Sequence, residues 1–180
     1  CIHADYDNDG NIDIFILRGA WLGTGGNHPN SLLKNIGDGT FIDVTAKAGL
    51  LSFHPSQTAA WADINNDGFL DLFIGNESKD NQLHPCELYI NQKNGTFLEQ
   101  SAKHNLASIE GFIKGVVFGD INNDKWPDLY ISVMGGTNLL FVNDFGKFKD
   151  ITNKAGVQGP YFSFSTWFWD VNNDGFNDIF

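Results

Sequence analysis

The chain has 180 residues, of which 42% are hydrophobic and 14% aromatic, and it contains 20 glycines. Its length suggests one domain, and its mixture of aromatic residues and glycine favours strands and tight turns over helices. With 22 acidic and 11 basic residues the net charge is −11, which argues against nucleic acid as a partner because phosphate binding needs a basic surface.

The cysteines and the ends of the chain give no indication of a disulfide framework or of a targeting segment. Two cysteines, Cys1 and Cys86, are too few for a disulfide framework, and two unpaired thiols are favoured over a bridge between them. No apolar run is long enough to span a membrane. The chain opens and stops inside a motif that recurs along it, so we expect an internal piece of a longer protein.

The recurring motif is a nine-residue segment rich in aspartate. Its four copies, here named the first to fourth Asp loops, occupy residues 5–13, 63–71, 120–128 and 170–178. The copies divide the chain into predicted repeat units at residues 5–62, 63–119, 120–169 and 170–180, the last of which holds only the start of a repeat.

Short apolar stretches flank these loops and predict strands. One stretch precedes a loop, at 58–62, 115–119 and 165–169, and another follows it, at 12–17, 70–74 and 129–133. A hairpin comes next, turning at Asp38-Gly39 or Asn94-Gly95. Four short strands per repeat predict an all-β, partial β-propeller of about three blades, with the Asp loop between a blade's first two strands. A β-solenoid fits less well, because its coils are shorter.

Each Asp loop has the oxygen pattern of a calcium site. Oxygen side chains stand at positions 1, 3, 5 and 9 of the motif, and position 7 can offer its main-chain carbonyl, as in an EF-hand loop that wraps a hard cation. The predicted metal ligands are Asp5, Asp7, Asp9, Asn11 and Asp13; Asp63, Asn65, Asp67, Phe69 and Asp71; Asp120, Asn122, Asp124, Trp126 and Asp128; and Asp170, Asn172, Asp174, Phe176 and Asp178.

Calcium is favoured over other ions and over a metal-free turn. Asx residues also suit polar turns, but four copies that all keep the ninth-position Asp argue against that reading. Mg²⁺ prefers octahedral sites that retain water, and transition metals prefer His or Cys, which the loops lack. Four Ca²⁺ ions would add +8 to the net charge of −11 and leave −3.

The loops are not EF-hands. An EF-hand places a bidentate Glu at position 12, whereas position 12 is isoleucine in the three loops that reach it, and we expect the ninth-position Asp to replace that Glu. Glycine at position 6 predicts a backbone with positive φ. The third loop has Lys125 there and Pro127 two residues later, so its site is the least certain of the four.

The residues of these motifs resemble the FG-GAP/VCBS repeat family of integrin-α-like propellers. Residues 5–10, 13–15, 35–41 and 43–50 are closest in pattern to the bacterial ASPIC/UnbV-type and cartilage acidic protein-like proteins. The resemblance implies a seven-bladed propeller that carries Ca²⁺ in its Asp loops. It also implies an exported protein, located outside the cell, at the cell surface or in the periplasm, that serves binding, adhesion or scaffolding.

We therefore expect a non-enzymatic binding module for a protein or carbohydrate ligand. Two alternatives stay open: a propeller domain of a polysaccharide-active enzyme, which would need a catalytic cluster in its channel, and a lectin-like module. Length varies most in the connections opposite the Asp loops, where binding usually occurs on a rigid scaffold. Those connections hold Trp21, His28, His54, Lys79, His84, Cys86, His104 and Tyr161.

Overall fold

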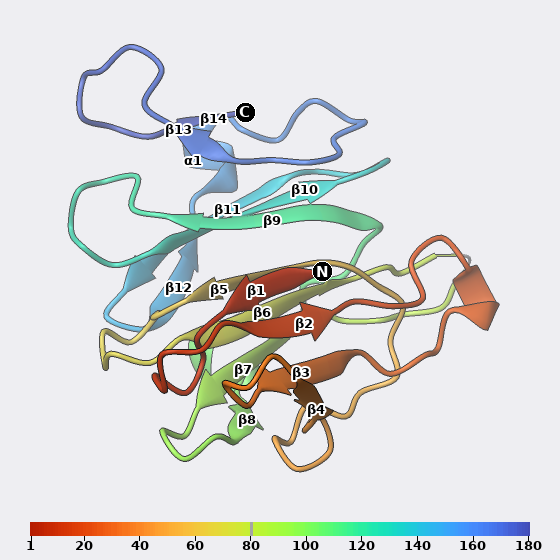
Figure 1. Cartoon of the computed structure of the whole chain (residues 1–180). Coiled ribbons are helices and arrows are strands. Elements are labelled where there is room, and N and C mark those ends of the chain that lie inside the picture. Colours follow the sequence, from red (N-terminus) through yellow and green to blue (C-terminus); the bar gives the residue numbers. More distant parts are fainter. Residues whose placement is uncertain (80) are drawn as a thin grey trace.

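The computed structural model describes residues 1–79 and 81–180. Its strands form successive antiparallel sheets, three of four strands and one of two (Figure 1). In each four-stranded sheet the strands pair in chain order, so every strand neighbours the one that precedes it. The prediction of an all-β chain with four strands per repeat is confirmed.

The sheets begin one strand before the Asp loop of their repeat. The first sheet contains β1 (Ile2–Ala4), β2 (Asp13–Ile16), β3 (Ser31–Asn35) and β4 (Phe41–Asp43). The second contains β5 (Ser56–Ala62), β6 (Asp71–Asn76), β7 (Glu87–Asn91) and β8 (Phe97–Glu99). The third contains β9 (Ile113–Gly119), β10 (Asp128–Val133), β11 (Leu139–Asp144) and β12 (Lys147–Asp150), and the fourth contains β13 (Phe168–Trp169) and β14 (Asp178–Ile179).

Helical structure is confined to short turns within the described residues. These are the 3-10 helices η1 (Gly23–Gly25) and η2 (Ala102–His104) and the single α-helical turn α1 (Thr152–Ala155). No described helix is long and apolar enough to cross a membrane.

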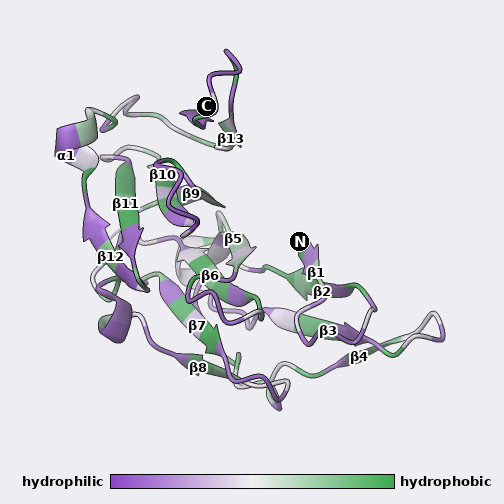
Figure 2. Cartoon of the chain, turned by 90° about the vertical axis from the view of Figure 1, so that its left-hand side faces the viewer, coloured by the Kyte–Doolittle hydropathy of each residue, from purple (hydrophilic) through white to green (hydrophobic). Residues whose placement is uncertain are grey.

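Neighbouring sheets pack face to face, and the two main apolar clusters lie between them. Phe15, Leu72 and Tyr89 belong to the cluster between the first and second sheets, and Phe73 and Ile113 belong to the one between the second and third. Viewed from the Asp-loop side, the sheets follow a curve with β1, β5, β9 and β13 on its inner edge (Figure 2). The strands β6, β7 and β10 are buried along their whole length, and because successive side chains point to opposite faces, the second and third sheets are covered on both faces.

Glycine permits a close approach between the second and third sheets at Gly75. A Cβ atom at Gly75 in β6 would lie 2.7 Å from Thr58 Cγ2 and 2.8 Å from Ile113 Cγ2. Both neighbours are β-branched and stiff at χ1. A larger residue at this position would therefore push the two sheets apart.

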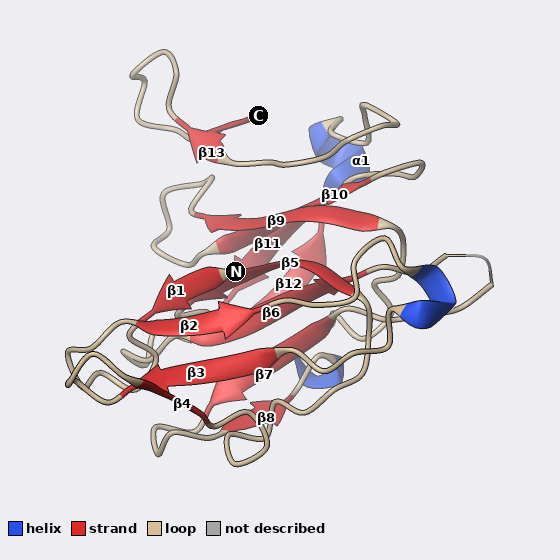
Figure 3. Cartoon of the chain, turned by 45° about the vertical axis from the view of Figure 1, so that its right-hand side comes forward, coloured by secondary structure: helices blue, strands red, loops and turns tan. Residues whose placement is uncertain are grey.

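The connections separate into two sides of the molecule, which Figures 1 and 3 show as its two ends. The four Asp loops and the hairpins between the third and fourth strands lie on one side, and the longer connections lie on the other. The first two hairpins are five-residue loops, 36–40 and 92–96, rather than the predicted two-residue turns. In the third, Phe145 and Gly146 form a two-residue turn, with φ of 51° and 81°.

Candidate metal centre

All four Asp loops share one backbone conformation, held by the Asp at position 1. In the first loop Asp5 Oδ1 accepts a hydrogen bond from Asp9 N–H at 3.0 Å, and Oδ2 accepts one from Gly10 N–H at 2.9 Å. The same pair of bonds recurs at Asp63, Asp120 and Asp170. The carboxylate thus folds its own loop and leaves further lone pairs on both oxygens for a cation.

The Asp at position 9 anchors the loop to the sheet. Asp13, Asp71 and Asp128 are each at most 1% exposed. Each accepts main-chain N–H bonds on both oxygens, one from position 2 of its loop and one from an Asn at the last or next-to-last position of the third strand of its sheet, at Asn35, Asn91 and Asn143. Asp178 has only the bond from Val171, since the fourth sheet has no third strand among the described residues.

Burial raises the pKa of these carboxyl groups, because it disfavours their charged form. It raises the pKa of Asp71 to about 7 and that of Asp128 to about 6, and the other carboxylates of each loop add to the effect. Burial also raises the pKa of Asp13. A buried carboxylate held among like charges is the environment that a bound cation relieves.

Three carboxylates of the first loop converge on one point. Asp5, Asp7 and Asp13 each place an oxygen within 4.8 Å of the others. Asp7 Oδ1 is buried and has no hydrogen-bond partner. Three converging carboxylates, one of which has a buried oxygen without a hydrogen-bond partner, fit a hard divalent cation, and the residues present therefore match the predicted group.

The predicted carbonyl ligands at position 7 are also available. No described residue donates a hydrogen bond to the carbonyl oxygen of the residue at position 7, which is Asn11, Phe69, Trp126 or Phe176. At position 3 the other loops have an amide in place of the carboxylate of Asp7, and Asn65, Asn122 and Asn172 each accept a hydrogen bond from their position 5.

The third loop keeps the common geometry although it has lysine at position 6. Lys125 adopts φ of +71°, close to the +87° to +89° of Gly10, Gly68 and Gly175. Lys125 N–H still donates to Asp120 Oδ2 at 2.8 Å. The substitution therefore places a side chain in the left-handed region without changing the fold of the loop, at a cost in backbone strain.

Two lysines outside the motifs reach the first two loops. Lys34, in β3, pairs with Asp7 and, at 3.0 Å, with Asp9. Lys93, in the hairpin after β7, pairs with Asp67 at 3.3 Å. The sequence analysis did not identify either lysine. Each lies within two residues of an Asn, Asn35 or Asn91, whose main-chain N–H bonds to the ninth-position Asp of the same loop.

Asparagine side chains link each loop to the next. The position-4 residues Asn8, Asn66 and Asn123 donate from Nδ2 to the position-6 carbonyl of the following loop, at Gly68, Lys125 and Gly175, over 3.0, 3.3 and 3.0 Å. Asn91 and Asn143 donate to the position-2 carbonyls of the preceding loops, at 2.8 and 2.9 Å. The sequence has an Asn at position 4 in every copy of the motif. That pattern does not by itself predict a bond between loops, because Asn at this position also suits a simple turn.

The side opposite the Asp loops holds most of the residues predicted there. His54 Nδ1 lies 2.9 Å from His84 Nδ1, and Cys1 and Cys86 are free thiols. The placement of His104 was wrong. It bonds to the carbonyl of Gly146 and lines a pocket with Asn65 and Asp67, because the short strand β8 leaves η2 beside the hairpin of the third sheet.

Comparison with known proteins agrees with the repeat structure. The FG-GAP-like repeat family matches residues 5–74 and again residues 63–131. The chain is similar to cartilage acidic protein 1 of Xenopus tropicalis and of Homo sapiens, with 31% identity over 107 and 108 residues, and to that of Mus musculus, with 30% over 108. Each alignment covers 59% of this chain and 16% of the relative's length.

Together the two family matches extend over residues 5–131, which is more than half of the chain, and they include the first three Asp loops and the whole second sheet. The chain therefore belongs to the FG-GAP-like repeat family.

Proposed function

We propose that this chain is a calcium-binding part of a β-propeller that serves binding, adhesion or scaffolding in an exported protein. The observation that carries the proposal is the convergence of the Asp5, Asp7 and Asp13 carboxylates, with Asp7 Oδ1 buried and unpartnered. The same backbone hydrogen bonds recur in the other three loops. Bound Ca²⁺ would add positive charge to a group of three carboxylates that, among the described residues, has only the ammonium of Lys34 beside it.

The arrangement of the sheets supports a propeller. In a β-propeller each blade is a four-stranded antiparallel sheet, and the innermost strands of successive blades lie side by side. Each Asp loop joins the first and second strands of its sheet. A cation bound there would therefore rigidify the inner edge of each blade. A role in binding rather than catalysis, and location outside the cell, follow by analogy with the family and stay proposals.

We place the main partner face opposite the Asp loops. A pocket of about 720 Å³ opens there between the second and third sheets, lined by Phe112, Met134 and Leu139 among others. Trp21, also in these connections, is 53% exposed. Variable connections carried on rigid sheets are where partners usually bind.

Thermal unfolding of the chain in CaCl₂ and in EDTA tests the calcium proposal. A metal that binds only the folded state should stabilise it by about 2.7 kcal/mol per site at a hundredfold excess over Kd. Asp5→Asn should reduce the gain, and the matched control Asp144→Asn, whose side chain is exposed and outside the loops, should not. Equal midpoints in the two buffers would refute calcium binding.

A further inference from the structure

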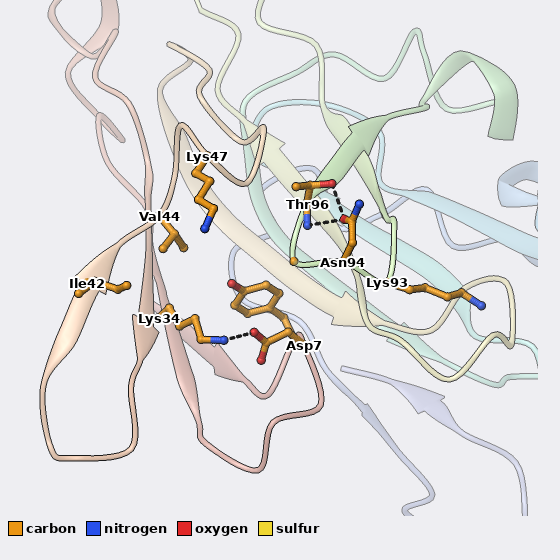
Figure 4. Close-up of a pocket in the computed structure, with 10 residues that line it drawn as sticks. Asp7, Lys34, Ile42, Val44, Lys47, Lys93, Asn94 and Thr96 are labelled. Carbon is orange, nitrogen blue, oxygen red and sulfur yellow. Dashed lines mark hydrogen bonds and ion pairs between the residues drawn. The ribbon is translucent and has the colours of Figure 1, made fainter.

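A pocket on the Asp-loop side lies between the first and second sheets (Figure 4). It has a volume of about 420 Å³, within the usual range for ligand sites. Its walls are the first Asp loop, β3, β4 and the hairpin 92–96. It is therefore distinct from the partner face proposed above.

The pocket collects positive charge in an acidic protein. Lys34, Lys47 and Lys93 line it, three of only 11 basic residues in a chain of net charge −11. The one carboxylate among its described lining residues is Asp7. No carboxylate of the described chain lies within ion-pair distance of Lys47, whose ammonium points into the pocket in Figure 4.

The other two lysines are held by carboxylates of the first and second Asp loops. Lys34 pairs with Asp7 and Asp9, at positions 3 and 5 of the first loop. Lys93 pairs with Asp67, at position 5 of the second loop. Calcium and these ammonium groups would compete for the same carboxylates, because a divalent ion binds them more strongly than a solvated ammonium does.

We propose that calcium binding in the first two Asp loops releases Lys34 and Lys93 and so turns this pocket into a binding site for an acidic peptide segment. The inference rests on the proposed function, since it needs calcium in those loops. Once Asp7 is engaged by the ion, the remaining charge of the pocket is positive, and it attracts carboxylates.

The rest of the lining favours a peptide over an acidic sugar. Ile42 and Val44 form an apolar wall, and Ile42 is 48% exposed, which suits an aliphatic side chain beside the acidic ones. Tyr6, the one aromatic residue among the described lining, is 2% exposed and offers no open ring face for a sugar. The Asn94 amide nitrogen, which donates no hydrogen bond among the described contacts, supplies a further donor at the mouth.

The probe is a short fluorescein-labelled peptide of alternating Glu and Val, followed by fluorescence anisotropy with the whole 180-residue chain at fixed ionic strength. In saturating CaCl₂ the peptide should bind about tenfold more tightly than in EDTA, and the same peptide with Gln for Glu should not bind. Lys47→Gln should weaken binding in CaCl₂, and Lys34→Gln should reduce the calcium-dependent gain. Lys154→Gln, in α1 and outside the pocket lining, should leave binding unchanged.

Calcium titration without peptide separates this inference from the proposed function. If calcium binds but peptide affinity is the same in CaCl₂ and EDTA, or the lysine variants match the parent, the pocket inference is overturned while the calcium proposal stands. If no calcium binds, the proposed function itself fails. If the Glu-Val peptide does not bind in CaCl₂ while a fluorescein-labelled oligogalacturonate binds there and loses affinity in Lys47→Gln, the pocket belongs to an acidic sugar and the peptide assignment is overturned.

Discussion

The side-chain amide of Asn8 in the first Asp loop donates a hydrogen bond to the main-chain carbonyl of Gly68 in the second, 3.0 Å away. Gly68 stands at position 6, and its own N–H bonds to Asp63 Oδ2 at 2.7 Å. One residue thus connects the conformation of its loop to that of the next. The bond recurs between the second and third loops and between the third and fourth.

We expect these amides to couple calcium binding between adjacent loops. Asn66→Gly keeps the left-handed backbone, where Asn66 has φ of 54°, but removes the bond to the carbonyl of Lys125. Because this bond is exposed, its loss should cost about 0.5 kcal/mol, and calcium affinity should fall at both the second and third loops. Isothermal titration calorimetry measures both sites.

Asn173→Gly is the matched control for that experiment. Asn173 occupies position 4 of the fourth loop with φ of 59° and donates to no other loop among the described residues. Its replacement should affect only the fourth loop. Equal effects of the two variants on the third loop would show that the amide does not carry the coupling.

Removing Lys34 should raise calcium affinity at the first loop. The ammonium neutralises Asp7 and Asp9 in the absence of the ion, so Lys34→Gln should lower the melting temperature in EDTA and tighten calcium binding about threefold. Calorimetry with Lys154→Gln as control measures the change. Weaker calcium binding in Lys34→Gln would mean that the lysine supports the site rather than competing for it.

Lys125→Gly should relieve strain in the third loop. A lysine at φ of +71° costs about 1 kcal/mol relative to glycine, and its charge lies next to the candidate site. The variant should bind calcium more tightly at the third loop alone, since the carbonyl that accepts from Asn66 is retained. An unchanged affinity, measured by calorimetry beside the parent chain, would show that position 6 does not limit this site.

Gly75→Ala should destabilise the contact between the second and third sheets. The added methyl would lie 2.8 Å from Ile113 Cγ2 in the third sheet, and such overpacking typically costs about 1–3 kcal/mol. Gly25→Ala is the control, because its Cβ would meet no atom within 4 Å and its φ is not positive. Urea unfolding measures both variants, and equal stability of the two would contradict the packing described for Gly75.

Acidification should weaken the contact between His54 and His84. Burial, followed by the charge of His54, lowers the pKa of His84 below its usual value of 6.5. The unfolded chain then takes up a proton more readily than the folded chain, so stability is lost as the pH falls below 6.5 toward the folded pKa. His84→Gln should lose less stability than the parent between about pH 7.5 and 5.5.

The control for this titration is His28→Gln, an exposed histidine of the same side. Comparing each variant with the parent removes the contribution of the loop carboxylates, which all three chains share. If His84→Gln and His28→Gln lose stability in parallel with the parent, the histidine pair is not a source of the pH dependence.

Much of the fold and of the candidate metal site could be predicted from the sequence, because both depend on contacts within a single repeat. Short apolar stretches on either side of the Asp loops indicated the strands, and glycine at position 6 indicated a left-handed backbone, which Gly10 adopts and which Lys125 adopts as well. The convergence of Asp5, Asp7 and Asp13 follows from nine consecutive residues. Features that depend on neighbouring residues in the chain can be predicted without knowledge of the rest of the molecule.

Only the tertiary structure decided which residues join one repeat to another. Asn8 and Gly68 are 60 residues apart, and Lys34 is 27 residues from Asp7; no local pattern determines which lysine or asparagine reaches a loop. The length of β8 likewise placed His104 on the Asp-loop side, against expectation. These contacts depend on the length of each strand and on the packing of its sheet against the next. Strand length and sheet packing are both determined by the burial of side chains throughout the core.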